Sequence, residues 1–349
     1  MVDQVTLGRR SLRGRLVPSS PPSRDPRGQN TALAAGLVLC VLAFALLAAV
    51  QGREPQAAGD GPAPVNPWRP FTHDSAWNDP IPDNPQLDAG SAAIAAYLSA
   101  DGYGHANLYE YGVPVYEAGS STPRHRVECR SDWGPCGLEE EPVPIPDGAR
   151  PAPGSDGAMV VIDRSTNRSY DFWQARQLPD GSWTASWGGV VDTSGDGYTP
   201  GAGQTGAGVP RLAGVVRTFE IEQGYIGHAL VFSTDNACGE DDFRYPASKS
   251  DGYSERPDCI PQGARIQLDP GIDIAAIPDI TPAEKTVARA LQTHGAYAID
   301  NGGARMAFIF ETPLREQDPY QGMGFTYDYF RLDHIPWADL RVLRQWDGG

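Results

Sequence analysis

Residues 158–233 read AMVVID (158–163), YDFWQAR (170–176), SWTASWGGVV (182–191), LAGVVRTFEI (212–221) and HALVFS (228–233). Each run is rich in β-branched and aromatic residues and is bounded by Gly, Pro, Asn or Asp, which is typical of β-strands. They predict a mainly β fold, an antiparallel β-sandwich of the jelly-roll type, in which this block supplies the central strands.

The flanking sequence adds further strands and one or two short helices. Residues 281–294 begin with Thr281, Pro282 and Glu284, a capping box around a proline at the first helical position. Residues 91–100 predict a second, shorter helix. More strands are expected at residues 109–116, 125–129, 264–268 and 304–310, and a last helix or strand in the tail from residue 335.

The charge is distributed unevenly along the chain. The net charge is −16; residues 1–52 carry six arginines against two aspartates, so this segment is at +4 and the remainder at −20. An acidic domain repels nucleic-acid phosphates, so no DNA or RNA partner is expected. The same negative charge weakly disfavours a strongly anionic polymer as a ligand, although a local basic groove could attract one despite the negative net charge of the domain.

Residues 31–50 form an uncharged run, and a helix of this length spans about 30 Å, the thickness of one bilayer core. Basic residues precede the run and acidic residues follow it, which places the N-terminus in the cytoplasm. We expect a disordered basic lead (1–30), a single-pass transmembrane signal-anchor (31–50), a stalk rich in Pro, Gly and Ala (51–67) and an extracellular β domain (68–349). A cleaved signal peptide and a secreted protein are the alternative.

Four cysteines follow the expected membrane segment. An even number in an extracellular domain favours disulfides. Of three possible connectivities we expect nearest-neighbour pairing, Cys129–Cys136 and Cys238–Cys259. A zinc site is the rival interpretation, but the close two-residue cysteine spacing typical of such sites does not occur in the sequence.

Asp171 and Trp173 are the first candidates for a functional site. Two residues apart in a strand, they point to the same face, where a carboxylate beside an aromatic ring suits a sugar. Trp187 is expected to add a second aromatic surface for the substrate. The competing interpretation is a structural Asp171 bonded to a turn, with Trp173 in the core.

Histidines and turn residues supply the other candidates. His228 and His125 each stand at the start of a strand and could act as a general base, or each is a structural residue. Asp74, Asn78 and Asp300 lie in turns rich in Pro or Gly, where the plain interpretation is turn formation. The functional interpretation is that two such acids face each other across a cleft, as in a glycosidase, with Asn78 binding the substrate.

The segment DTSGDG (192–197) imitates the first half of a calcium-binding loop, with Asp192 and Asp196 as candidate ligands. The twelfth position is Gly203 instead of Glu, so calcium would need further ligands from elsewhere, and no cofactor is expected to be required. The chain lacks the Gly-x-Ser-x-Gly, phosphate-loop and His-Glu-x-x-His motifs, which removes support from esterase, nucleotide and zinc protease functions.

The order of several motifs resembles that of a group of secreted actinobacterial proteins. These motifs are DSAWNDPI (74–81), YDFWQA (170–175) and GHALVFS (227–233), with others at 122–125, 143–146, 265–270 and 290–303. The resemblance covers residues 70–312 and implies a protein outside the cell. The group is similar in style to secreted carbohydrate-active β-sandwich proteins. The resemblance assigns no role to any residue.

Two functions of different classes follow from these patterns. The first is a membrane-anchored extracellular enzyme acting on polysaccharide or cell-wall glycan, a glycoside hydrolase using an Asp pair or an Asp with a His, or else a polysaccharide lyase. The second is a non-catalytic surface module that binds glycan or protein. The enzyme should gather Asp171, His228 and one of Asp74, His125 or Asp300 in one cleft, whereas the module should leave them scattered.

Overall fold

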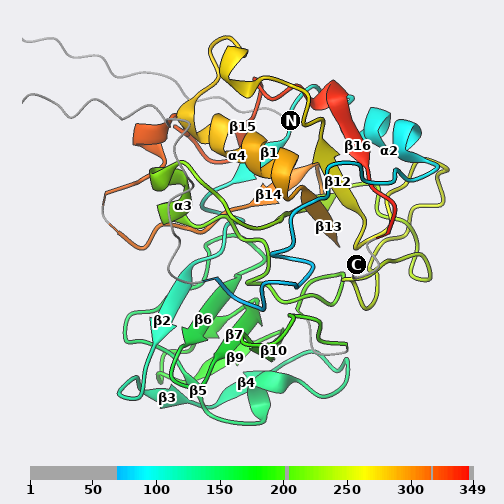
Figure 1. The fold of residues 1–349 in the computed structure, drawn as a ribbon. Helices are drawn as coiled ribbons and strands as arrows, with labels where there is room; N and C mark the ends of the chain where they lie inside the picture. Colours follow the sequence, from blue (N-terminus) through cyan, green and yellow to red (C-terminus); the bar gives the residue numbers. More distant parts are fainter. Residues whose placement is uncertain (1–68, 201–203, 316, 346–349) are drawn as a thin grey trace, which may run out of the picture. The chain divides into compact units, whose positions relative to one another are not determined.

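The computed structural model describes residues 69–200, 204–315 and 317–345 (Figure 1). The expected lead, membrane segment and stalk (1–30, 31–50 and 51–67) lie outside the described residues. Within the part that is described, no helix is both long enough and apolar enough to span a membrane.

Short strands dominate the described residues, which confirms a mainly β fold. The α-helices are α2 (Ser91–Leu98), α3 (Thr218–Gln223) and α4 (Pro282–Thr293). The strands are β1 (His105–Asn107), β2 (Val115–Ala118), β3 (Arg124–His125), β4 (Val127–Cys129), β5 (Val143–Pro144), β6 (Met159–Asp163), β7 (Arg168–Trp173), β8 (Arg176–Gln177), β9 (Trp183–Ala185), β10 (Trp187–Asp192), β11 (Leu230–Thr234), β12 (Arg265–Leu268), β13 (Ala296–Asn301), β14 (Ala307–Ile309), β15 (Phe330–Arg331) and β16 (Leu340–Val342).

The largest sheet has seven strands in the order β15-β1-β14-β11-β13-β12-β16. Its pairing is mixed, because β1 runs parallel to β14 and β11 parallel to β13, while the other pairs are antiparallel. The purely antiparallel arrangement expected from the sequence is therefore wrong for these strands. Hydrophobic patterns show which segments are strands, but β1 and β14 come from opposite ends of the described chain, and no local pattern pairs them.

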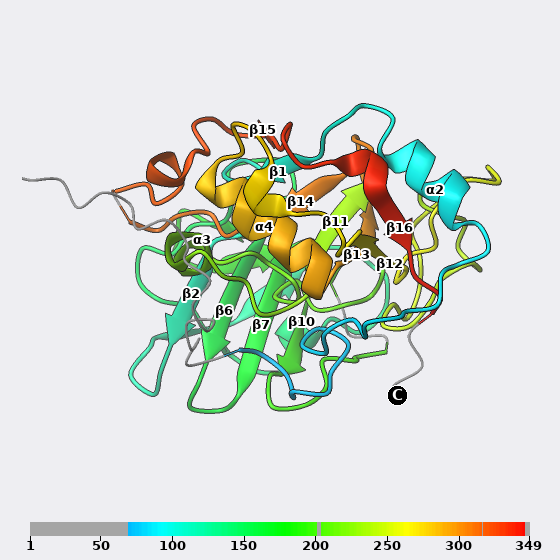
Figure 2. The ribbon, with the colours of Figure 1, turned by 45° about the horizontal axis from the view of Figure 1, so that its top comes forward.

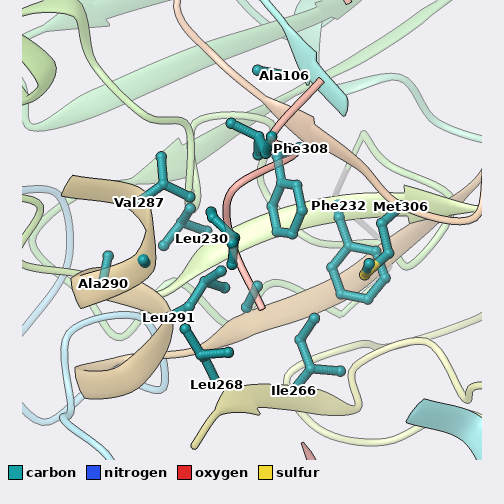
Figure 3. Packing of buried hydrophobic residues seen from close by; sticks show 14 of the residues in the cluster. Ala106, Leu230, Phe232, Ile266, Leu268, Val287, Ala290, Leu291, Met306 and Phe308 are labelled. Atoms are coloured by element: carbon teal, nitrogen blue, oxygen red, sulfur yellow. The ribbon is translucent and has the colours of Figure 1, made fainter. Parts of the chain in front are cut away.

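One face of the large sheet is covered by α4, which begins with the predicted capping box of Thr281 and Glu284. Figure 3 shows the apolar side of this helix, with Val287, Ala290 and Leu291, next to Leu230, Ile266 and Leu268 of the sheet. Burial of each Val, Leu or Ile contributes about 1.5–3 kcal/mol, so tertiary packing holds the helix on the sheet.

The opposite face packs against a four-stranded sheet, β10-β7-β6-β2 (Figure 2). Val160 and Ile162 of β6 share an apolar cluster with Val231 of β11 and Ile299 of β13. The alternate residues of β6 belong to a third cluster, together with residues of β4 and β9. Since β6 is buried on both faces, its sequence is a continuous apolar run instead of an alternation.

Residues 212–221 contain part of a helix where the sequence predicts a strand. Val216 is extended and bridges to Phe310, but α3 begins two residues later. The Glu220 carboxylate accepts a hydrogen bond from the Arg217 backbone N at 2.9 Å, which stabilises the first helical turn. Residues 211–214 form turns, so the β-branched pattern predicts extended chain correctly only around Val216.

Both predicted disulfides, Cys129–Cys136 and Cys238–Cys259, are present. Among the residues described, the one group of side chains close enough to share a metal joins Cys238, Cys259 and Asp242, and its two sulfurs are bonded to each other. The rival zinc interpretation therefore does not apply to these cysteines. Disulfides are consistent with an oxidising compartment.

Candidate functional site

A cavity of about 800 Å³ lies where residues of both sheets and the neighbouring loops meet. Its volume falls within the range of about 300–1,000 Å³ that is typical of small-molecule sites. The four-stranded sheet contributes Trp173 and Trp187, and the large sheet contributes His105, Ser233 and Asp300. The loops contribute Trp133, Asp156, Arg211, Lys249 and Asp251.

Three tryptophans, Trp133, Trp173 and Trp187, form what we call the tryptophan wall. Trp173 on β7 is the register partner of Trp187 on β10, so both point to the same face of their sheet. Trp133 belongs to the loop closed by the Cys129–Cys136 disulfide, and its ring stacks on Trp173 at a centroid distance of 5.5 Å. Because 64% of Trp133 is exposed, the wall presents aromatic surface to a ligand.

Four residues of the cavity form a row across the large sheet. His105 on β1 pairs with Ala307 on β14, Ala307 pairs with Ser233 on β11, and Ser233 pairs with Asp300 on β13. Paired residues point to the same face, and neighbouring strands lie about 4.8 Å apart. The row therefore supplies one polar side of the cavity, with the small Ala307 between Ser233 and His105.

A β-bulge brings Asp300 into this row. Phe232 pairs with Ala298, but the next residue, Ser233, pairs with Asp300, so Ile299 is an extra residue on β13. Bulges change the direction of a side chain and are frequent beside active sites. Without the bulge, the alternation of side chains would place Asp300 on the same face of the sheet as Ala298. That face belongs to the apolar core under α4.

The Asp300 carboxylate is held by two partners. Its Oδ1 accepts a hydrogen bond from the Gly206 backbone N at 2.8 Å, and its Oδ2 lies 3.3 Å from Arg211 Nη2. Burial raises the pKa of Asp300 to about 6 against the opposing effect of Arg211, and the charge of Asp251 adds to the rise. Such a group can hold a proton in mildly acidic solution and donate it to a substrate.

Asp251 also lies next to Gly206. Its Oδ1 accepts hydrogen bonds from the Asn301 backbone N at 3.0 Å and from the Gln262 side chain. A Cβ atom on Gly206 would lie 2.2 Å from the Asp251 carboxyl carbon. Because Gly206 also donates to Asp300, the two acids converge on one residue, and we call Asp251 and Asp300 the carboxylate pair.

Asp171 is fully buried and is not among the residues that line the cavity. Its Oδ2 accepts a hydrogen bond from the Arg211 backbone N at 2.7 Å. Burial raises the pKa of Asp171 to about 6, and the bond from Arg211 partly counteracts this rise. Asp171 therefore fixes the backbone of the residue whose guanidinium binds Asp300, and has no direct access to a ligand.

The raised pKa of Asp171 predicts a pH-dependent stability. Between about pH 4 and pH 6 the folded protein holds a proton that the unfolded chain has released, so stability falls as the pH rises. The Asp171→Asn side chain does not titrate, so this variant does not lose stability in the same way as the pH rises. Its stability relative to the wild type should therefore increase by about 3 kcal/mol from pH 4 to pH 7. Urea unfolding at several pH values measures the difference, and a constant difference would contradict the assignment.

His228 lies in a second, much smaller cavity of about 20 Å³, lined also by Arg69 and Trp77. Its Nδ1 is 2.9 Å from the backbone O of Ala229, and its Nε2 is 3.1 Å from Glu220 Oε2. Donation from both nitrogens to these two oxygens requires the imidazolium form of the ring. Burial opposes this charge, but Glu220 raises the pKa of His228 above its ordinary value.

Three other predicted residues are also absent from the lining of the large cavity. The Asn78 side-chain N donates to the backbone O of Pro70 at 2.9 Å and of Thr72 at 3.0 Å, and so holds a loop together. His125 lies on β3, and Asp74 is exposed. Of the predicted residues, the structure therefore brings together Asp300, Trp173 and Trp187. The set expected of an enzyme is not gathered in one cleft, because Asp171, His228, Asp74 and His125 all lie outside the large cavity. This scatter is the arrangement expected of a binding module, and catalysis would have to combine Asp300 with other residues of the cavity.

The candidate calcium ligands each support a turn. Asp192 Oδ1 accepts hydrogen bonds from the backbone N of Ser194 at 2.8 Å and from its hydroxyl at 2.6 Å. Asp196 Oδ1 accepts one from the Tyr198 backbone N at 2.9 Å. These bonds agree with the interpretation as a Gly-rich loop, and calcium binding stays a prediction.

Several cavity residues carry no signal in the sequence that would single them out. Asp251, Arg211 and His105 lie in loops or short strands whose partners are distant along the chain. Trp133 does have a signal, because an aromatic residue inside a short disulfide loop has little chance of being buried. That position could have been proposed beside Trp173 and Trp187.

No family model matches the chain, and no curated protein and no solved structure does either. The function must therefore be inferred from the chemistry of the cavity.

Proposed function

We propose that this protein is a glycoside hydrolase, anchored to the membrane and exposed outside the cell, that binds polysaccharide or cell-wall glycan in the large cavity. The supporting observation is that the tryptophan wall and the carboxylate pair line the same cavity of about 800 Å³. The apolar face of a sugar ring stacks on indole, while its hydroxyl groups bond to carboxylates. The cavity thus offers a saccharide both an aromatic surface for its ring and carboxylates for its hydroxyl groups.

In this proposal Asp300 is the general acid and Asp251 the general base. Asp300 gives its proton to the glycosidic oxygen, and the bond from the anomeric carbon breaks with its electron pair on that oxygen. Water adds to the anomeric carbon, and Asp251 takes the proton that the water loses. One water is consumed, two shorter saccharides are released, and exchange with solvent returns each acid to its starting state.

The test is the release of reducing ends by the full chain from a panel of soluble polysaccharides and cell-wall glycan, followed over time. New reducing ends and inversion at the anomeric carbon, observed by NMR, are expected for a base-assisted attack of water. Binding without any cleavage, at all pH values between about 4 and 8, would rule out the hydrolase. An unsaturated product would instead indicate an elimination by a lyase.

A binding module without catalysis is the second candidate. The contact between Arg211 and Asp300 favours it, because a cation beside the carboxylate opposes the protonated form that an acid catalyst needs. A module would bind a saccharide on the tryptophan wall without cleaving it. Removal of the Asp300 charge would then change affinity modestly and have no other effect.

Gly206→Ala should impair hydrolysis while leaving the fold intact. The added methyl group would overlap the Asp251 carboxylate and displace it from the carboxylate pair, and a displacement of about 1 Å can cost about 10²-fold in rate. The matched control is Gly303→Ala, because Gly303 also lines the cavity and its new Cβ would meet nothing within 4 Å. Equal rates for the two variants would contradict the role given to Asp251.

A further inference from the structure

Arg211 is a buried cation whose hydrogen-bonding capacity is largely unused. Its side chain is 8% exposed, and only Nη2 contacts a carboxylate, that of Asp300 at 3.3 Å. Nε is buried and has no acceptor within the described part of the chain. A buried donor without an acceptor costs about 1–3 kcal/mol, more for a charged group, so an unsatisfied guanidinium at the edge of a cavity calls for an explanation.

Lys249 is the second cation of the cavity, and it forms no ion pair with the described residues. It is exposed, and its stem lies over residue 208, where an added Cβ would be 3.1 Å from Lys249 Cγ. Its backbone N contacts the backbone O of Ala207, the residue after Gly206. Lys249 and Arg211 therefore border the part of the cavity that holds the carboxylate pair.

The hydroxyl groups of a neutral sugar can accept hydrogen bonds from both cations, but they leave the two positive charges uncompensated. An anionic group would compensate both charges, since the guanidinium forms charge-assisted hydrogen bonds with a carboxylate and the ammonium adds a point charge. The surplus of acidic residues elsewhere counts against a densely charged polyanion. A single uronic acid ring in the cavity brings one carboxylate to the two cations, which is enough to compensate their charge beside the two acids.

We propose that the saccharide bound in this cavity carries a uronic acid, whose carboxylate is bound by Arg211 and Lys249. This substrate class depends on the proposed function, because it names the ligand of the same site. The sugar ring lies on the tryptophan wall, and its carboxylate is directed toward the two cations. Lys249 is thus a specificity residue for acidic over neutral sugars.

The test compares two tetrasaccharides that differ only in charge: a tetrauronate and its counterpart with every carboxylate reduced to a primary alcohol. α-Linked galacturonate and β-linked glucuronate are used as two separate pairs. Calorimetric titration of the full chain should show one acidic form binding about ten- to a hundredfold more tightly than its reduced counterpart, the effect of a charge-assisted hydrogen bond.

The chain offers a matched control, because Lys249 and Lys285 are its two lysines and Lys285 is absent from the lining of the cavity. Lys249→Gln should remove most of the preference for the acid, and Lys285→Gln should keep it. The inference fails if the reduced tetrasaccharide binds or is cleaved as well as the acid, and the proposed function then survives. If neither form binds nor is cleaved, both fail. An unsaturated product from the acid would support the uronate and replace hydrolysis by elimination.

Discussion

We expect Asp300→Asn to hydrolyse glycosidic bonds about 10²–10⁴-fold more slowly than the wild type, the usual contribution of a general acid. The amide has no acidic proton to donate, but its oxygen can still accept the hydrogen bond from the Gly206 backbone N. Saccharide affinity should change far less than the rate. Initial rates of reducing-end release, measured beside calorimetric affinities, separate the two effects.

The pH dependence provides the control for this prediction. The pKa of Asp300 of about 6 predicts that wild-type activity declines as the pH rises through 6, because the acid loses its proton. The residual activity of Asp300→Asn should lack this decline. A variant that keeps both the wild-type rate and the wild-type pH profile would contradict the assignment of Asp300 as the acid.

The largest effect on stability is expected at His228. His228→Ala removes one partner of a buried ion pair and leaves the Glu220 side chain, which is 1% exposed, without that partner, which costs about 3–5 kcal/mol. Because the pKa of His228 is raised in the folded protein, its contribution is complete below about pH 6.5 and is lost as the pH rises through the folded pKa. Chemical unfolding at acidic and alkaline pH measures both quantities.

A surface ion pair serves as the comparison. Glu117 and Arg164 form an ion pair in which the side chains are 46% and 44% exposed, and Glu117→Gln should cost no more than about 1 kcal/mol. If His228→Ala costs as little as this variant, or if its cost grows with pH, the imidazolium assignment is wrong. Saccharide binding in the large cavity should be the same for both variants at temperatures where each is folded.

The sequence predicts those features of the fold that depend on neighbouring residues. The capping box at Thr281, the strand character of β6 and β7 and both disulfides are determined by local pattern or by cysteine spacing, and all are confirmed. The parallel pairing of β1 with β14 has no such local basis. It arises when two segments that are distant along the chain bury their apolar sides between α4 and the four-stranded sheet.

The candidate site was predicted only in part for the same reason. Alternation along a strand predicts the direction of Trp173, and Trp187 is predicted as a further substrate-binding residue. The sequence predicts Asp300 as a turn residue, yet it reaches the cavity through a bulge that hydrophobic alternation cannot reveal. The sequence leaves His228 open between a general base and a structural residue, and its contact with Glu220 on α3, a helix that the pattern does not predict, agrees with the structural interpretation.

The central claim is that a saccharide binds against the tryptophan wall, and an affinity measurement on two aromatic variants tests it most directly. Trp133→Ala removes an exposed ring that stacks on Trp173, and Tyr253→Ala removes a ring that is 75% exposed and is absent from the cavity lining. For a tetrasaccharide that the wild type binds, Trp133→Ala should weaken the affinity about two- to tenfold, while Tyr253→Ala should leave it unchanged. Equal affinities for the wild type and both variants, or no binding of any saccharide, would contradict the account.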